Sequence, residues 1–326
     1  MLITPRPGAD RRSIRDALRH AHTAAMNLRG HSGGDAYQRL LRYLEWATET
    51  AGTLRYQVSD ADVDHLVLTR RYQALLSSCG SLAGSYQERL VNGLVELEIT
   101  ERVQAFESAQ EALDTRIREW SELECFVVAD SSFYCHNPEQ LKEVDLHKIL
   151  DLRSHENVRL LFPITVVDEL DGLKESGKQQ GRWRASHTLG LLDELLRGRT
   201  SGIWHRGGFL PEAEEVRGKV NVEIVLDPPG HVRLPIPDDE IIDRTVAIQA
   251  LAAREVRMLT CDTGQHTRGR AAGLNVTKIP AKDLGPEPDW EAMNKAGSGT
   301  RAARRERQAA QTQAAHKPLG TGTTAE

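Results

Sequence analysis

The sequence contains few cysteines, no long apolar run and no excess of basic residues. Its four cysteines form no CxxC pair, which argues against a zinc ribbon or a disulfide framework and favours a reduced cytoplasm. The longest apolar stretch, residues 160–167, is interrupted by Pro163 and falls far short of the roughly 18 residues of a membrane span. Because the N-terminus also lacks the apolar core of a secretion signal, we expect a cytoplasmic protein that does not cross a membrane.

The charge is weakly acidic overall, with 42 Lys and Arg, 47 Asp and Glu and a formal net charge of −5. This balance argues against a protein that coats nucleic acid by bulk positive charge. The acidic excess lies in residues 123–290, whereas residues 291–326 are net basic. The length of 326 residues is typical of about two domains.

Several catalytic motifs are absent as well. No histidine pair has the HxxxH or HxH spacing, and no Ser, His and Asp set with a nucleophile elbow occurs, which argues against acyl-transfer hydrolysis. Residues 172–178 match GxxxxGK, the start of a phosphate-binding loop, but Gln179 stands where Ser or Thr would bind Mg²⁺. The segment also follows a predicted helix rather than a strand, so we interpret it as a glycine-rich loop.

Residues 1–122 are predicted to form an all-α domain. Apolar side chains at 37, 40, 41 and 44 recur with helical spacing. Ser59–Asp62 is a predicted cap for a second helix that runs through Leu76 and stops at residues 79–81.

A third, long helix is expected over residues 85–120. It carries a heptad seam with one polar member: Ile99, Val103, Phe106, Gln110, Leu113, Ile117 and Trp120. The seam has two interpretations, packing against the other N-terminal helices or self-association with a partner helix.

From residue 123 the periodicity changes to short apolar runs that alternate with helical segments. The expected strands are residues 126–129, 159–162, 220–226, 256–260 and 275–279, and the expected helices are residues 164–173, 184–197, 238–255 and 263–272. This alternation predicts an α/β domain with a mainly parallel sheet over residues 123–286. Residues 287–326 have too few large apolar side chains to form a core and are expected to be a disordered basic tail.

Acidic residues recur where the predicted strands end. Asp130 and Asp262 each terminate a strand, Glu169 lies in the helix after the second strand, and Asp239 lies at the start of a later helix. In a parallel sheet these positions share one edge, where ligands bind. Carboxylates gathered there would repel one another unless a cation lies among them, and oxygen ligands favour Mg²⁺ or Mn²⁺. Phosphodiester hydrolysis is the chemistry that uses such a cluster.

Three further residues are expected to support the four acids. Asp238 is the predicted N-cap of its helix, with Asp239 as the inward ligand. Asp243, one turn further along, and the hydroxyl of Ser132 are expected to orient the metal-binding groups.

The ordered set of motifs in residues 123–286 resembles the PIN (PilT N-terminal) nuclease family. The resemblance rests on FVVAD–SS at 126–132, PITVVDEL at 163–170, DEIIDRTVAI at 239–248 and LTCD at 259–262, and it covers about half of the chain. It implies a three-layer α/β/α fold, with the family's acidic positions at Asp130, Glu169, Asp239 and Asp262. The family often has Thr-Asn after the first acid, whereas this chain has Ser131-Ser132, and the long helical region and an insertion near residues 198–219 are not features of toxin ribonucleases.

The resemblance further implies cleavage of single-stranded RNA with Mg²⁺ or Mn²⁺, or of flap-like DNA in some branches. A basic segment with aromatic residues follows Glu169 and includes Lys174, Lys178, Arg182, Trp183 and Arg184. Such a segment suits phosphate contacts and base stacking with a single strand, although a solvated helix face with a structural tryptophan is the alternative.

Three hypotheses follow. The first is a metal-dependent ribonuclease in which a metal-activated water attacks in line and leaves a 5′-phosphate. The second is a non-catalytic PIN-like module that binds RNA or protein, and the third is a structure-specific DNA nuclease.

Overall fold

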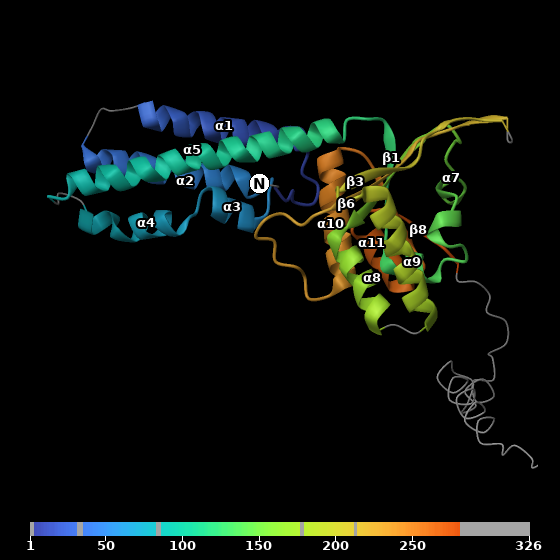
Figure 1. Ribbon diagram of the computed structural model, residues 1–326. Helices are drawn as coiled ribbons and strands as arrows, with labels where there is room; N and C mark the ends of the chain where they lie inside the picture. Colours follow the sequence, from blue (N-terminus) through green and yellow to red (C-terminus); the bar gives the residue numbers. More distant parts are fainter. Residues whose placement is uncertain (1–2, 31–34, 83–85, 177–178, 212–213, 281–326) are drawn as a thin grey trace, which may run out of the picture. The chain divides into compact units, whose positions relative to one another are not determined.

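The computed structural model describes residues 3–30, 35–82, 86–176, 179–211 and 214–280 (Figure 1). The predicted tail, residues 287–326, lies outside these residues. Within them, a helical N-terminal region is followed by an α/β region with a mainly parallel sheet, as the sequence predicts. None of the helices described there combines the length and the hydropathy that crossing a bilayer requires.

The N-terminal region is built around one long helix. Its helices are α1 (Arg11–Gly30), α2 (Ala36–Leu54), α3 (Asp60–Leu66), α4 (Arg70–Leu82) and α5 (Glu88–Glu119). Helix α5 packs against the other four and shares with them a core that contains Leu40, Tyr43, Trp46 and Phe106. Burial of these large side chains supplies most of the driving force for folding of this region.

The heptad seam of α5 lies inside that core. Ile99, Phe106 and Leu113 are at most 3% exposed, and their neighbours are the other N-terminal helices. Trp120, the residue after the helix, is 1% exposed and packs in the core of the α/β region instead. The first interpretation of the seam is therefore correct, and these side chains are not free to bind a partner helix.

The predicted helix through Leu76 is divided in two. Ser59 caps α3 as expected, but α3 ends at Leu66 and a new helix starts at Arg70. The Thr69 hydroxyl accepts a hydrogen bond from the backbone N–H of Tyr72 at 3.1 Å, so this side chain caps the new helix. Helix α4 then continues through Gly80 to Leu82, so the predicted stop at residues 79–81 is wrong.

The α/β region contains a six-stranded sheet. Its strands are β1 (Glu124–Ala129), β2 (Asn157–Pro163), β3 (Ser201–His205), β6 (Val220–Val225), β7 (Val256–Thr260) and β8 (Asn275–Lys278), in the order β3-β6-β2-β1-β7-β8. All neighbours are parallel except β3 and β6. The β1 and β2 strands are almost wholly apolar because helices cover both faces of the sheet.

Helices connect the strands and form the outer layers. They are α6 (Ser131–His136), the 3₁₀ helix η1 (Leu141–Glu143), α7 (Leu146–Ile149), α8 (Ile164–Ser176), α9 (Gln179–Leu196), α10 (Pro237–Ala252) and α11 (Thr263–Ala271). Helices α8 and α9 pack together as a pair (Figure 1). The sequence patterns did not indicate α6, α7 or the ribbon of β4 (Gly208–Leu210) and β5 (Glu215–Arg217) that occupies the predicted insertion.

A buried ion network joins α5 to the sheet. We call it the junction network and define it by Arg116, Glu124, Arg159 and Glu223. Arg159 donates to Glu124 Oε2 at 2.5 Å and to Glu223 Oε2 at 2.8 Å, while Arg116 donates to Glu223 Oε1 at 2.6 Å. Each carboxylate in the network therefore contacts at least one guanidinium, which compensates the loss of water around it.

Candidate functional site

The strand order brings the predicted acidic residues to one edge of the sheet. Strands β2, β1 and β7 are parallel neighbours. Asp130 directly follows β1, and Asp262 lies two residues after the end of β7. Glu169 lies in α8, which follows β2, and Asp239 lies in the first turn of α10. We call Asp130, Glu169, Asp238, Asp239 and Asp262 the acid edge.

Asp130 is the most firmly held residue of this edge. It is 3% exposed and caps α6 by accepting a hydrogen bond from the Phe133 N–H at 2.9 Å. The Ser132 hydroxyl donates to Asp130 Oδ1 at 2.7 Å, and the Thr260 hydroxyl donates to Oδ2 at 2.6 Å. Both carboxylate oxygens are therefore oriented by donors from the two neighbouring strand ends.

Thr260 was not singled out from the sequence. The register pairs Ala129 with Leu259, so the next residues along the two parallel strands, Asp130 and Thr260, are neighbours. The Thr260 hydroxyl also accepts the Asp262 N–H at 2.9 Å. The signal that could have identified Thr260 is its position two residues before Asp262, at the end of a strand parallel to β1.

Three carboxylates of the acid edge act on one another electrostatically. Burial raises the pKa of Asp130, although its hydroxyl and amide donors oppose the shift, and the charge of Asp238 raises it further. Burial likewise raises the pKa of Glu169, a Ser131 hydrogen bond opposes this, and the charges of Asp238 and Asp130 add to the increase. Each shift means that the ionised form is disfavoured at this edge.

The chemistry of the side chains at this edge suits a divalent cation, but among the described residues no three of these carboxylates place oxygens within 4.8 Å of one another. Glu169 Oε2 is buried and has no hydrogen-bond partner among the described residues. No lysine or arginine in that part of the chain forms an ion pair with Asp130 or Glu169 at 4.0 Å or less. A cation with oxygen ligands would satisfy the unpaired oxygen and neutralise the mutual repulsion.

A family model of the PIN domain matches residues 127–279, the segment that runs from β1 to the end of β8. This segment belongs to the PIN domain family. No curated protein matches the chain. PIN domains are generally nucleases that use a divalent metal, so the fold here is of nuclease type.

The start of α10 in the PIN domain differs from the prediction. The helix begins at Pro237 with Ile236 as the N-cap, so Asp238 is not the cap but lies in the first turn. Proline favours the first helical position because its φ angle is already helical and its missing N–H costs nothing there. Asp238 is thus the α10 residue whose charge acts on Asp130 and Glu169, whereas Asp239 was expected to be the inward ligand.

The two remaining acids have local partners. Asp262 caps α11 by accepting the Gln265 N–H at 2.8 Å, and its side chain is exposed. Asp243 forms an ion pair with Arg244, the next residue of α10. Asp243 therefore has a partner of its own and forms no hydrogen bond or ion pair with the acid edge among the described residues.

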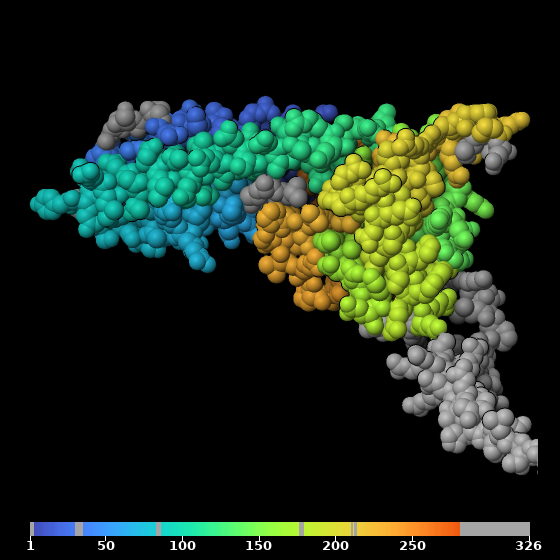
Figure 2. All heavy atoms as spheres, in the orientation of Figure 1, coloured from blue at the N-terminus to red at the C-terminus, as the bar shows by residue number. Residues whose placement is uncertain are grey.

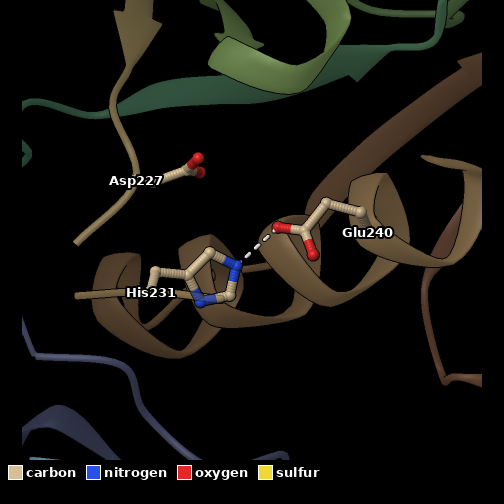
Figure 3. A group of neighbouring side chains, drawn as sticks. All are labelled: Asp227, His231 and Glu240. Atoms are coloured by element: carbon tan, nitrogen blue, oxygen red, sulfur yellow. Dashed lines mark hydrogen bonds and ion pairs between the residues drawn. The ribbon is translucent and has the colours of Figure 1, made fainter. Parts of the chain in front are cut away.

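A different group of three donors lies close enough together to bind an ion. Among the described residues, only Asp227, His231 and Glu240 place three possible metal ligands, an imidazole nitrogen and two carboxylate oxygens, within 4.8 Å of one another (Figure 3). His231 Nε2 lies 2.7 Å from Glu240 Oε1, and Glu240 Oε2 accepts the Leu234 N–H at 2.8 Å. Arg244 Nε lies 3.3 Å from Glu240 as well. These contacts fasten the loop of residues 226–236 to α10.

The same loop is fastened to α8. Arg233 donates to Asp227 Oδ2 at 2.7 Å and to Asp168 Oδ2 at 2.6 Å, and Asp168 directly precedes Glu169. Figure 2 shows this loop and the start of α10, in orange, beside the green surface of α8. The loop therefore borders the acid edge.

The predicted nucleic-acid-binding residues lie on α8 and α9. Arg184 donates to the carbonyl of Pro138 at 3.1 Å, and the half-exposed Trp183 ring lies 5.6 Å from the ring of His187. Lys174 and Arg182 are exposed, whereas the side chain of Lys178 lies outside the described residues.

Proposed function

We propose that the protein is a metal-dependent ribonuclease that cleaves single-stranded RNA at the acid edge. The observation that carries the proposal is the pair of Asp130 and Glu169, whose anions burial and the nearby charge of Asp238 disfavour and which form no ion pair with a lysine or arginine within the described residues. Asp130, Glu169, Asp239 and Asp262 would hold Mg²⁺ or Mn²⁺, with Asp238 beside them. A bound ion would supply an activated water and stabilise the leaving oxygen.

The residues around Asp130 keep it in one orientation. Ser132 and Thr260 each donate to a different oxygen, and their own oxygens accept the N–H groups of Cys261 and Asp262. A carboxylate held in this way loses little conformational entropy when it binds a ligand.

The α8 and α9 helices supply the contacts expected for a single strand. Arg184 lies near the two acids, because all three act on the same side chain, Cys135. Burial raises the pKa of the Cys135 thiol, the charge of Arg184 lowers it, and the charges of Asp130 and Glu169 raise it. Arg184 and Arg182 would contact phosphates, and the exposed face of Trp183 would stack on a base.

The test measures cleavage of single-stranded RNA by wild type and Asp130→Asn with Mn²⁺ or with EDTA. Asp193→Asn, which changes an exposed carboxylate on α9, is the matched control. We expect the wild type and the control to cleave only with metal, and Asp130→Asn to lose most activity while keeping its circular dichroism spectrum. Equal cleavage by Asp130→Asn and wild type would reject the assignment, and a preference for flap DNA would replace RNA as the substrate.

A further inference from the structure

The acid edge carries one ion pair that the proposed reaction does not use. Arg268, on α11, places Nη1 3.1 Å from Asp238 Oδ2 and 3.6 Å from Asp239 Oδ1. One guanidinium thus bridges two successive carboxylates in the first turn of α10. The three side chains are 40 to 46% exposed, so this pair is accessible to solvent and to ions.

This pair includes acids of the proposed metal site. The charge of Asp238 acts on Asp130 and Glu169, so Arg268 pairs with a member of the same electrostatic group. A divalent ion bound by these acids and a guanidinium paired with Asp238 and Asp239 would be like charges only a few ångströms apart. Such charges repel strongly in a partly desolvated site.

We propose that Arg268 is an internal counter-ion that occupies Asp238 and Asp239 until a divalent ion displaces it. This inference rests on the proposed function. The Arg268 side chain is long and half exposed, and both of its contacts come from a single nitrogen rather than from a two-nitrogen fork. An exposed pair of this kind contributes little stability, so its release costs little.

The counter-ion lowers the affinity of the site for metal. Removing the positive charge while keeping a polar side chain should therefore tighten metal binding. Replacing arginine by lysine keeps the charge and should preserve the wild-type affinity. Arg270 is an exposed arginine of the same helix with no ion pair among the described residues, so its replacement is the matched control for net charge.

The experiment titrates Mn²⁺ into the full chain by calorimetry, without RNA, for wild type, Arg268→Gln, Arg268→Lys and Arg270→Gln. We expect Arg268→Gln to bind Mn²⁺ roughly tenfold more tightly than wild type at low ionic strength, since a partly screened charge a few ångströms away is removed. Arg268→Lys and Arg270→Gln should bind within about twofold of wild type by the same argument.

The outcomes separate this inference from the proposed function. If wild type binds Mn²⁺ and Arg268→Gln binds it equally or more weakly, the counter-ion role is wrong and the metal site stands. If Arg268→Gln and Arg270→Gln tighten binding equally, the effect is one of net charge and the inference is also wrong. If neither wild type nor Arg268→Gln binds at millimolar Mn²⁺ while both remain folded, the proposed function itself fails.

Discussion

Strand β1 has a buried carboxylate at each end, and the two carboxylates differ in whether a cation is paired with them. Glu124, at its start, contacts Arg159 in the junction network and accepts a further hydrogen bond from Asn221. Asp130, just after its end, is held by hydroxyl and amide donors alone among the described residues. A buried carboxylate paired with a guanidinium is typical of a structural role, whereas buried carboxylates without a paired cation indicate a candidate cation-binding site.

The largest expected effect comes from breaking the paired end. Arg159→Met removes the guanidinium that both Glu124 and Glu223 contact and leaves two carboxylates buried with less compensation. We expect the free energy of unfolding to fall by about 3–5 kcal/mol. Urea unfolding followed by circular dichroism measures it, with the exposed Arg153→Met as control. A loss below about 1 kcal/mol would show that the network contributes only as an exposed pair does.

The two ends also differed in how far the sequence predicted them. The chain positions of the acid-edge residues could be found from the sequence, because each lies shortly after a strand or on a helix that follows one, and parallel strands bring such positions to one edge whatever the length of the connections. That they bind a metal stays a prediction. The junction network was not predictable, because its members come from α5 and three different strands, and no sequence pattern indicates which charged residues of these elements meet.

Local chemistry explains two further errors. Proline at 237 moved the start of α10 by one residue, so Asp238 exchanged the capping role for a place in the first turn. The capping hydroxyl of Thr69 divided one predicted helix into two. Both features depend on a single side chain and do not alter the apolar spacing from which the helices were predicted.

The opposite result is expected at the unpaired end. Glu169→Gln removes a charge that Asp130 and Asp238 repel, so we expect the free energy of unfolding at pH 7 to rise by up to about 1 kcal/mol, allowing for solvent screening. Metal-dependent cleavage should fall at the same time, because a residue that is needed for activity can lower the stability of the folded protein. Glu175→Gln, an exposed change on the same helix, is the control. A clear loss of stability in Glu169→Gln would contradict the claim that this end is electrostatically strained.

The stability difference between Glu169→Gln and wild type should depend on pH with a definite sign. Folding raises the pKa of Glu169, so the folded state binds the proton more tightly than the unfolded state does. The stabilising contribution is therefore complete below the unfolded pKa, near the ordinary value of 4.5, and is lost as the pH rises through the folded pKa. Unfolding measured from pH 4 to pH 7 should show the advantage of Glu169→Gln shrinking as the pH falls. An advantage that grows on acidification would reverse the assigned direction.

The smallest effect is expected at the solvent-facing side of the junction network. Lys219 Nζ lies 2.8 Å from Glu122 and 3.8 Å from the buried Glu124, and its side chain is 32% exposed. Because Glu124 keeps its contact with Arg159, Lys219→Met should lower the free energy of unfolding by less than about 1 kcal/mol, with Lys142→Met as the exposed control. In the Arg159→Met background the same change should cost more, since Lys219 would then be the cation left beside Glu124. Additive losses in the double variant would show that Arg159 and Lys219 act on Glu124 independently. The buried charge of Glu124 would then be compensated by the Arg159 guanidinium alone.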